Sequence, residues 1–551
     1  MSNLSNLRIR SRAFCFHCLL LLALLGGTGS TRAARVTLIT HGFNASVDEW
    51  IVPMANRMAG YTSFHGADAS IYQLTVTTNA SGHFVTSTEF LDGTPAGESG
   101  SGNLFILLDW SNVAGSFVSF LEIYPARFTV TQIAEVVTPA LLNPALLADL
   151  NGRALAEYPL HLIGHSRGGP LISELARLLG AEGIWVDQLT MLDPHPCDPA
   201  DPLEAIGCPV LDAQPAVFAN VRFADNYWQN LGSGIDLHGQ PVPGAYNRQL
   251  LSLPNGYSLN HSDTHLWYHG TIDFGSPAFD GGALLNTSDR PTWFAPGETN
   301  GLQAGFLLSQ IGGGDRTSAS RPAGATTAEI REGLLGARQS LPVNNGTWPN
   351  VIELRASNPG RFRYQNEPGL APREEHVAYP DDTLAIAADY QSGGPATWTT
   401  FLDPDANELN GNEIALGQES LSATGTGAFS NIVRAVSVAA TQVPYGVYHL
   451  GARITGGPPG SSRVQYAAQK VAVLTPLELA LSNFGGGQGQ LSVTGSAGYR
   501  AAVETTDNLA DWEAAGVIPF SAGSFGQPTT IDEPLALEAP ARFFRATYLR
   551  P

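Results

Sequence analysis

A serine flanked by glycines is the strongest candidate for chemistry in this sequence. Residues Gly164 to Gly168 read GHSRG, which fits the G-x-S-x-G pattern of a serine nucleophile. The apolar run HLIG leads into Ser166, and the helical pattern PLISELARLLG follows it. The sequence therefore predicts a sharp strand-to-helix turn that exposes the Ser166 hydroxyl at a helix N-terminus, where negative charge is favoured.

A serine hydroxyl needs a histidine to take its proton and a carboxylate to orient that histidine. We expect both downstream of Ser166, in the order serine, acid, histidine. Asp193 ends QLTMLD and Asp225 follows FANVRF one strand later, so either carboxylate is suitably placed. The segment NHSDTHLWYHG offers three histidines, His261, His265 and His269. The residues alone leave the acid and the histidine undecided.

The same three histidines are four residues apart, which is also a spacing of metal ligands. Zinc is not expected, because no set of thiolates or carboxylates accompanies them. Hydrolysis by an activated serine needs no cofactor, and the sequence predicts none.

Acyl transfer also requires two main-chain N–H groups that hold the oxyanion. The residue after a serine nucleophile supplies the first, and here it is Arg167. We expect Phe43 in THGFN to supply the second. This segment directly follows the first expected strand, and Gly42 lets the backbone approach closely.

The elements that position these residues are read from the pattern of apolar residues. Short apolar runs alternate with helical patterns and predict an α/β fold with a mostly parallel sheet over residues 35–311. A linker or irregular segment follows over 312–366, then an Ig-like β-sandwich over 367–476 and a β-rich module over 477–551. The expected parallel strands are VTLIT, SIYQLTV, LFILLDW, HLIG, QLTMLD and FANVRF.

The N-terminus and the composition bear on where the chain works. Residues 1–34 resemble a signal peptide, with arginines, an apolar run and then small residues; a single membrane anchor is the alternative. The formal net charge of -20 argues against a nucleic-acid partner, because phosphates are bound by Lys and Arg. Without residues 1–34, Cys197 and Cys208 remain and are expected to form a disulfide, with two free thiols as the alternative.

Together the motifs resemble the pancreatic-lipase-like branch of the α/β-hydrolases. The resemblance lies in ITHGF, LLDW, HLIGHS, MLDP and a histidine followed by Trp-Tyr and Thr-Ile. It implies the α/β-hydrolase fold and selects Asp193, which lies in the family's Leu-Asp-Pro context, and His261, which begins an H-x5-aromatic-Tyr segment. The chain departs from the family at Arg167, where a small or aliphatic residue is usual, and it shows no long disulfide-bounded lid.

The second half of the chain resembles β-modules of exported multidomain bacterial proteins. Its segment DPDANELNGNE places Asp403, Asp405 and Asn407 like the start of a calcium loop. The glycine and glutamate that an EF-hand requires are replaced by Glu408 and Ile414, so a solvated turn is expected instead.

The sequence thus predicts a secreted, cell-surface or periplasmic serine hydrolase that cleaves carboxylic esters, as a lipase or esterase does. The expected partners are an ester or lipid substrate and, for the C-terminal β-modules, a cell surface or polymer. Two alternatives stay open. One is another acyl hydrolase, such as a polyester depolymerase, phospholipase or peptidase. The other is a surface adhesion protein whose hydrolase scaffold is inactive.

Overall fold

The structure is a computed structural model of the 551-residue chain. The segment 1–34, on which the expected signal peptide falls, lies outside the described residues. The structure describes residues 35–549 except 61–68, 97–101, 120–121, 202–204, 233–236, 274, 295–337, 342–347, 359–361, 366–372, 381, 406, 409, 426–429, 439–442, 458–460, 486–487, 521–527 and 537–542.

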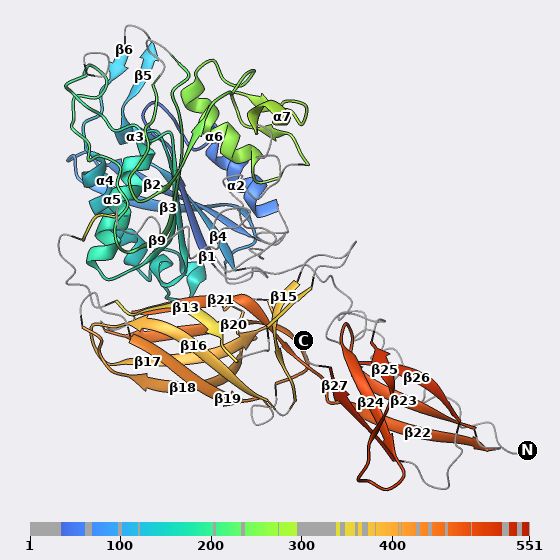
Figure 1. The fold of residues 1–551 in the computed structure, drawn as a ribbon. Helices are drawn as coiled ribbons and strands as arrows, with labels where there is room; N and C mark the ends of the chain where they lie inside the picture. Colours follow the sequence, from blue (N-terminus) through green and yellow to red (C-terminus); the bar gives the residue numbers. More distant parts are fainter. Residues whose placement is uncertain are drawn as a thin grey trace, which may run out of the picture.

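The first part of the chain is built on an eight-stranded sheet (Figure 1). Its strand order is β10-β9-β8-β7-β1-β4-β2-β3, and every neighbouring pair is parallel except β2 with β3. The strands are β1 (Arg35–Thr40), β2 (Ser70–Thr78), β3 (Phe84–Gly93), β4 (Asn103–Asp109), β7 (Leu160–His165), β8 (Val186–Leu192), β9 (Val221–Gln229) and β10 (Tyr246–Leu250).

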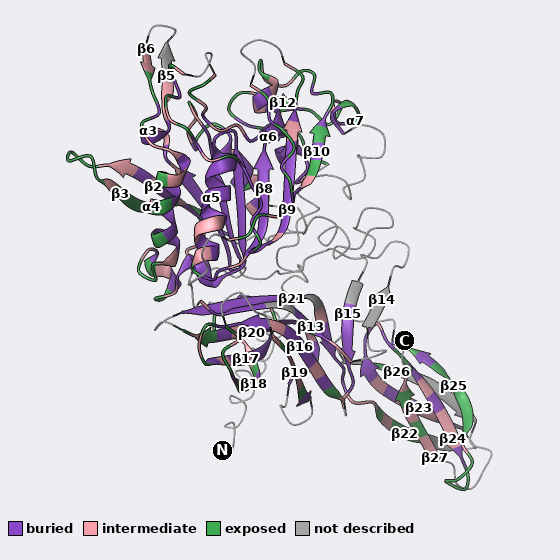
Figure 2. Ribbon diagram, turned by 60° about the vertical axis from the view of Figure 1, so that its left-hand side comes forward, coloured by how far each residue is buried: buried purple, intermediate pink, exposed green. Residues whose placement is uncertain are grey.

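Helices cover both faces of this sheet because its central strands are apolar on both sides. Consecutive residues of β1 enter different cores: Leu38 packs with α4 and α5, and Ile39 packs with α2 and α6. The central strands are accordingly buried, whereas β3 at the edge is largely exposed (Figure 2). The helices are α2 (Ile51–Gly60), α3 (Ser111–Ala114), α4 (Val130–Leu142), α5 (Gly168–Ala181), α6 (Asn260–Gly270) and α7 (Arg290–Trp293), with 3-10 turns η1 (Ala148–Leu150) and η2 (Leu155–Glu157).

Two short hairpins lie outside this sheet. They are β5 (Ser116–Ser119) with β6 (Glu122–Tyr124), and β11 (Ala278–Phe279) with β12 (Leu284–Leu285).

A sandwich of two sheets follows. A three-stranded sheet in the order β13-β16-β19 packs against a six-stranded sheet in the order β14-β15-β21-β20-β17-β18, around a core that includes the buried Trp398. The strands β13 and β14 lie within the segment 312–366 that the sequence assigned to a linker. The strands are β13 (Asn350–Ala356), β14 (Phe362–Gln365), β15 (Arg373–Ala378), β16 (Thr383–Gln391), β17 (Ala396–Asp403), β18 (Ile414–Leu421), β19 (Ser430–Ser437), β20 (Gly446–Gly456) and β21 (Ser462–Val473).

The last module holds two three-stranded sheets around a small apolar core. Their strand orders are β22-β23-β26 and β25-β24-β27, and all pairs are antiparallel. The strands are β22 (Glu478–Gly485), β23 (Gln488–Ser496), β24 (Arg500–Thr506), β25 (Glu513–Pro519), β26 (Pro528–Ala536) and β27 (Phe543–Tyr548).

Buried charges join the sandwich to the amino ends of β7 and β8. Arg463 of β21 donates from Nη2 to Oδ2 of Asp187 at 2.6 Å and from Nη1 to the carbonyl of Ala156 at 2.8 Å. Both side chains of the ion pair are nearly inaccessible, with 2% and 3% exposed. The sandwich is therefore attached at the end of the sheet opposite to the carboxyl ends of its strands.

The predicted α/β fold class is wrong for this chain. Strands account for 44% of the residues and helices for 16%, so the chain is predominantly β. The prediction gave weight to helical patterns before residue 273. The many antiparallel strands after residue 349, together with the antiparallel edge strand β3, outweigh those helices. Among the described residues, no helix is both long enough and apolar enough to span a bilayer.

Candidate active site

Ser166 lies in a strained turn between β7 and α5. Its φ is 56°, a left-handed conformation that costs free energy for any residue other than glycine. The turn is tight enough to require glycine, since a Cβ placed on Gly164 would lie 2.2 Å from the carbonyl oxygen of Gly168. The main-chain N–H of Ser166 donates to the carbonyl of Leu192 at 2.9 Å, which fixes the turn to the end of β8.

Asp193 follows β8 at the same edge of the sheet, because Leu192 is paired with His165 in the parallel register. Its carboxylate is fully buried. The main chain and the side-chain amide of Gln229 donate to it at 2.9 and 2.8 Å, and the main-chain N–H of Gly239 donates at 2.8 Å. These donors hold the carboxylate in one orientation.

His261 lies in the first turn of α6, and its Nδ1 is 2.7 Å from Oδ2 of Asp193. A carboxylate only accepts hydrogen bonds, so the proton of the neutral ring belongs on Nδ1, which leaves Nε2 as a proton acceptor. The ring of His165, the residue before Ser166, is 4.6 Å from the His261 ring between centroids. The structure thus brings His261 and Asp193 together beside the Ser166 turn.

The two alternatives from the sequence lie in other networks. Asp225 accepts hydrogen bonds from Thr190 at 2.6 Å and from Tyr227 at 2.9 Å. His265 faces Asp280, with Nδ1 3.2 Å from Oδ2, and stacks on Trp50. The carboxylate bonded to Nδ1 of His261 is that of Asp193.

The turn after β1 approaches the serine closely. A Cβ placed on Gly42 would lie 2.7 Å from Cβ of Ser166 and 2.9 Å from the main-chain nitrogen of Arg167. Nδ1 of His41 lies 2.8 Å from the carbonyl oxygen of Gly42, and because a carbonyl only accepts, Nδ1 donates this hydrogen bond. This bond fixes the peptide between Gly42 and Phe43 beside the serine.

The Arg167 side chain does not extend into solvent. Only 2% of it is exposed, and it pairs with Asp212, whose side chain is fully buried. Its positive charge is thus compensated inside the protein. Asp212 was not identified from the sequence, because the residues around an aspartate in an irregular loop do not indicate which side chain it pairs with.

His165 was missed as well. Its Nε2 is 2.9 Å from the carbonyl oxygen of His261, so it links the nucleophile turn to the helix that carries the histidine. Burial holds the pKa of His165 well below its usual 6.5. The ring is therefore neutral, and since a carbonyl only accepts, Nε2 carries the proton.

The structure pairs Cys197 with Cys208 in a disulfide, with the Cα atoms 5.3 Å apart. The loop that they close lies beside Ala126, whose N–H donates to the carbonyl of Gly207 at 2.8 Å. In the described part of the chain, no group of three or more His, Cys, Asp or Glu side chains is arranged to hold a metal ion. Asp405, in the segment compared with a calcium loop, accepts from the amides of Asn410 and Asn412.

No protein family model matches the chain. No curated protein matches it either. Among solved structures, it is similar to red sea bream transglutaminase, with 9% identity, a TM-score of 0.15, and 41% of this chain and 32% of that chain covered. It is also similar to CBD12 from CALX1.2, with 11% identity, a TM-score of 0.13, and 31% and 78% covered. Squid arrestin shows 8% identity, a TM-score of 0.12, and 34% and 80% covered.

These findings correct the resemblance to the pancreatic-lipase-like α/β-hydrolases. No family model supports it, and the chain is predominantly β, with 44% of its residues in strands and 16% in helices. The predicted family membership is therefore wrong. The short motifs on which it rested are local, and local motifs do not establish a family. Function has to be argued from the geometry of the site itself.

Proposed function

We propose that this protein is an exported serine hydrolase that cleaves carboxylic esters. The observation that carries the proposal is the 2.7 Å contact between Nδ1 of His261 and the buried carboxylate of Asp193, beside the left-handed Ser166. A base oriented by a buried carboxylate next to a strained serine is the arrangement that serine activation requires.

In the proposed reaction, Oγ of Ser166 attacks the ester carbonyl while Nε2 of His261 takes its proton. The carboxylate of Asp193 stabilises the imidazolium that forms. The N–H groups of Phe43 and Arg167 hold the oxyanion of the tetrahedral intermediate. His261 then protonates the leaving alcohol, and the acyl group stays on Ser166. Water attacks this acyl group while His261 takes its proton, and His261 then gives the proton to Oγ of Ser166 as the acid is released.

An activity-based probe tests this proposal directly. A fluorophosphonate should label the purified wild-type chain and should fail to label Ser166→Ala. A panel of esters of increasing acyl length, compared with matched amides, then identifies the leaving group and the acyl preference. If the wild type is not labelled, or if Ser166→Ala is labelled equally well, the hydrolase proposal is wrong.

A further inference from the structure

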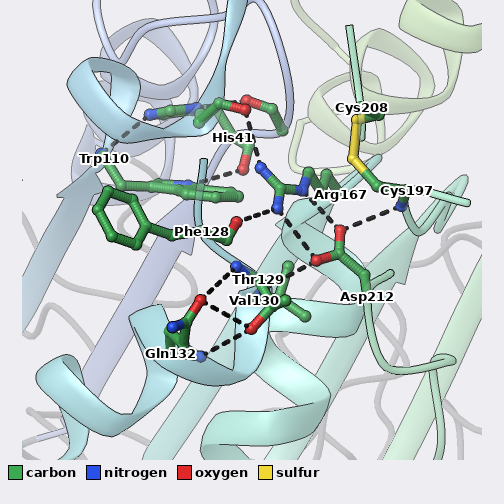
Figure 3. Close-up of polar contacts among 12 residues, drawn as sticks. His41, Trp110, Phe128, Thr129, Val130, Gln132, Arg167, Cys197, Cys208 and Asp212 are labelled. Atoms are coloured by element: carbon green, nitrogen blue, oxygen red, sulfur yellow. Dashed lines mark hydrogen bonds and ion pairs between the residues drawn. A yellow bond between two sulfur atoms is a disulfide. The ribbon is translucent and has the colours of Figure 1, made fainter. Parts of the chain in front are cut away.

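The side chain of Arg167 forms a two-pronged ion pair with Asp212 (Figure 3). Nε of Arg167 donates to Oδ2 of Asp212 at 2.6 Å, and Nη2 donates to Oδ1 at 3.0 Å. Parallel bonds of this kind fix the plane of the guanidinium as well as its position. The two side chains are 2% and 0% exposed, so water does not compete for these bonds.

Two main-chain carbonyls complete the surroundings of the guanidinium. Nη1 donates to Ala114 at 2.8 Å and Nη2 donates to Phe128 at 2.5 Å. The guanidinium also lies over the ring of Trp110, 5.1 Å from its centroid. Arg167 therefore connects the turn after the serine to the end of α3 and to the segment that leads into α4.

Asp212 is held on both carboxylate oxygens (Figure 3). Oδ1 also accepts from the main-chain N–H of Val130 at 2.9 Å, and Oδ2 accepts from that of Cys197 at 3.1 Å. The N–H of Asp212 in turn donates to the carbonyl of Cys197 at 3.0 Å. Cys197, whose main chain makes two of these bonds, is itself cross-linked to Cys208.

We propose that Asp212 is a positioning residue for the oxyanion site. By holding the Arg167 side chain, it keeps the main-chain N–H of Arg167 directed at the oxyanion. The inference rests on the proposed hydrolase function, because only an acyl-transfer reaction develops charge at that place.

The backbone explains why such an anchor is needed. Ser166 is left-handed with φ 56°, and Arg167 returns at once to a helical conformation with φ -58° and ψ -21°. A left-handed residue other than glycine persists only where its surroundings over-determine it. Oxyanion donors act by being in place before charge develops, so freedom at Arg167 would weaken the site.

The simpler explanation is that this pair only stabilises the fold, and the chain contains a matched control. Arg463 and Asp187 are equally buried and also pair at 2.6 Å. Asp187 lies at the amino end of β8, six residues before Asp193 and so roughly 20 Å from the site at ~3.3 Å per residue. Loss of that pair should affect folding and leave the oxyanion site intact.

The experiment compares Asp212→Asn, Arg167→Lys and Asp187→Asn in the full chain. For each, kcat and KM are measured on a soluble ester, the concentration of intact sites is measured with the phosphonate, and the thermal midpoint is recorded. The inhibition constant of a trifluoromethyl ketone, whose adduct places an oxyanion in the same site, is measured as well.

We expect Asp212→Asn to lower kcat per labelled site by ~10²-fold, the scale of one lost oxyanion donor, while KM changes by less than about twofold. Its affinity for the ketone should fall by a similar factor. Arg167→Lys keeps the positive charge but loses the two parallel bonds to Asp212. Its kcat per labelled site should therefore lie between those of the wild type and of Asp212→Asn. Asp187→Asn should lower the thermal midpoint and leave kcat per labelled site unchanged.

Two results overturn the inference. In the first, Asp212→Asn and Arg167→Lys keep the wild-type kcat and ketone affinity per labelled site. In the second, Asp187→Asn loses kcat and ketone affinity to the same degree as Asp212→Asn. If Asp212→Asn does not fold, Arg167→Lys alone decides by the same measurements. Failure of the hydrolase proposal is recognised separately: the phosphonate then does not label the wild type, and the positioning role falls with it.

Discussion

His165 and His261 are joined by a hydrogen bond from Nε2 of the first to the main-chain carbonyl of the second, at 2.9 Å. Because His165 precedes the proposed nucleophile, this bond couples two elements that are 96 residues apart. It fixes the beginning of α6 against the end of β7. The distance between the serine and the base therefore depends on a residue that itself takes no part in the proton transfer.

Replacing His165 with Phe should lower kcat by roughly 10- to 100-fold, since a small displacement of the base is costly in a site of fixed geometry. KM should stay within about twofold, because substrate contacts are not removed. His165→Gln, whose amide can still donate, should retain more activity. Steady-state kinetics on a soluble ester, normalised to phosphonate-labelled sites, checks this, and equal activity of all three chains would contradict it.

Asp193→Asn should lower kcat by roughly 10⁴-fold, because an amide no longer favours the productive tautomer of His261. Asp225→Asn is the matched control: it is an equally buried aspartate whose described bonds go to Thr190, Gln188 and Tyr227. It should alter stability and retain kcat per labelled site. A larger catalytic loss from Asp225→Asn would reassign the acid.

Gly42→Ala should reduce kcat by about 10²-fold or more, because the added methyl group would overlap Cβ and Oγ of Ser166 and the nitrogen of Arg167. The backbone must move to relieve these contacts. Gly60→Ala is the control, since a Cβ there meets nothing within 4 Å. Kinetics and thermal midpoints of the two variants separate a local effect from general destabilisation; the idea fails if Gly42→Ala is as active as Gly60→Ala.

Three buried histidines should each weaken the fold as the pH is lowered from about 7 to about 5. Burial lowers the pKa of His165, of His265 and of His269 from 6.5, in His269 to about 3. Below pH 6.5 the unfolded chain binds protons that the folded chain does not, so each histidine removes up to ~1.4 kcal/mol of unfolding free energy per pH unit, until the pH reaches its folded-state pKa.

Urea unfolding across this pH range measures the effect. His269→Asn should make the dependence of the unfolding free energy on pH shallower by about one proton, because it removes a buried imidazole with a lowered pKa. The same slope in the wild type and in His269→Asn would show that burial of this histidine is not linked to stability.

Arg463→Met should destabilise the contact between the sandwich and the sheet by about 3 kcal/mol, because it removes the closer partner of the buried Asp187. Arg545→Met is the contrast: its partner is Glu504 at the surface, and the expected loss is below ~1 kcal/mol. Denaturant unfolding measures both. Similar losses of unfolding free energy in the two variants would mean that burial of the Arg463–Asp187 ion pair does not determine its contribution to stability.

Several local features could be predicted from the sequence. The apolar runs predicted strands that the structure contains as β1, β2, β4, β7, β8 and β9, and the glycines predicted the turn at Ser166. The fold class could not be predicted in the same way. The β-modules after residue 366 were expected from the sequence, but the α/β class was assigned from the alternation of strands and helices before residue 312. The class of the chain depends on its total content of strand and helix, 44% and 16%, which the sequence pattern does not quantify.

The sequence by itself determined the strand–turn–helix around Ser166, because glycine spacing and periodicity act within a few residues. The residues alone left Asp193 and Asp225 as alternatives, since both follow apolar strands, and the resemblance favoured Asp193; the tertiary structure shows the carboxylate of Asp193 2.7 Å from Nδ1 of His261. It also decided that the Arg167 side chain pairs with Asp212, 45 residues away. The physical reason is the same in both cases. The partner of a buried charged side chain depends on which strand ends and loops the sheet register brings together, and the local sequence does not specify that register.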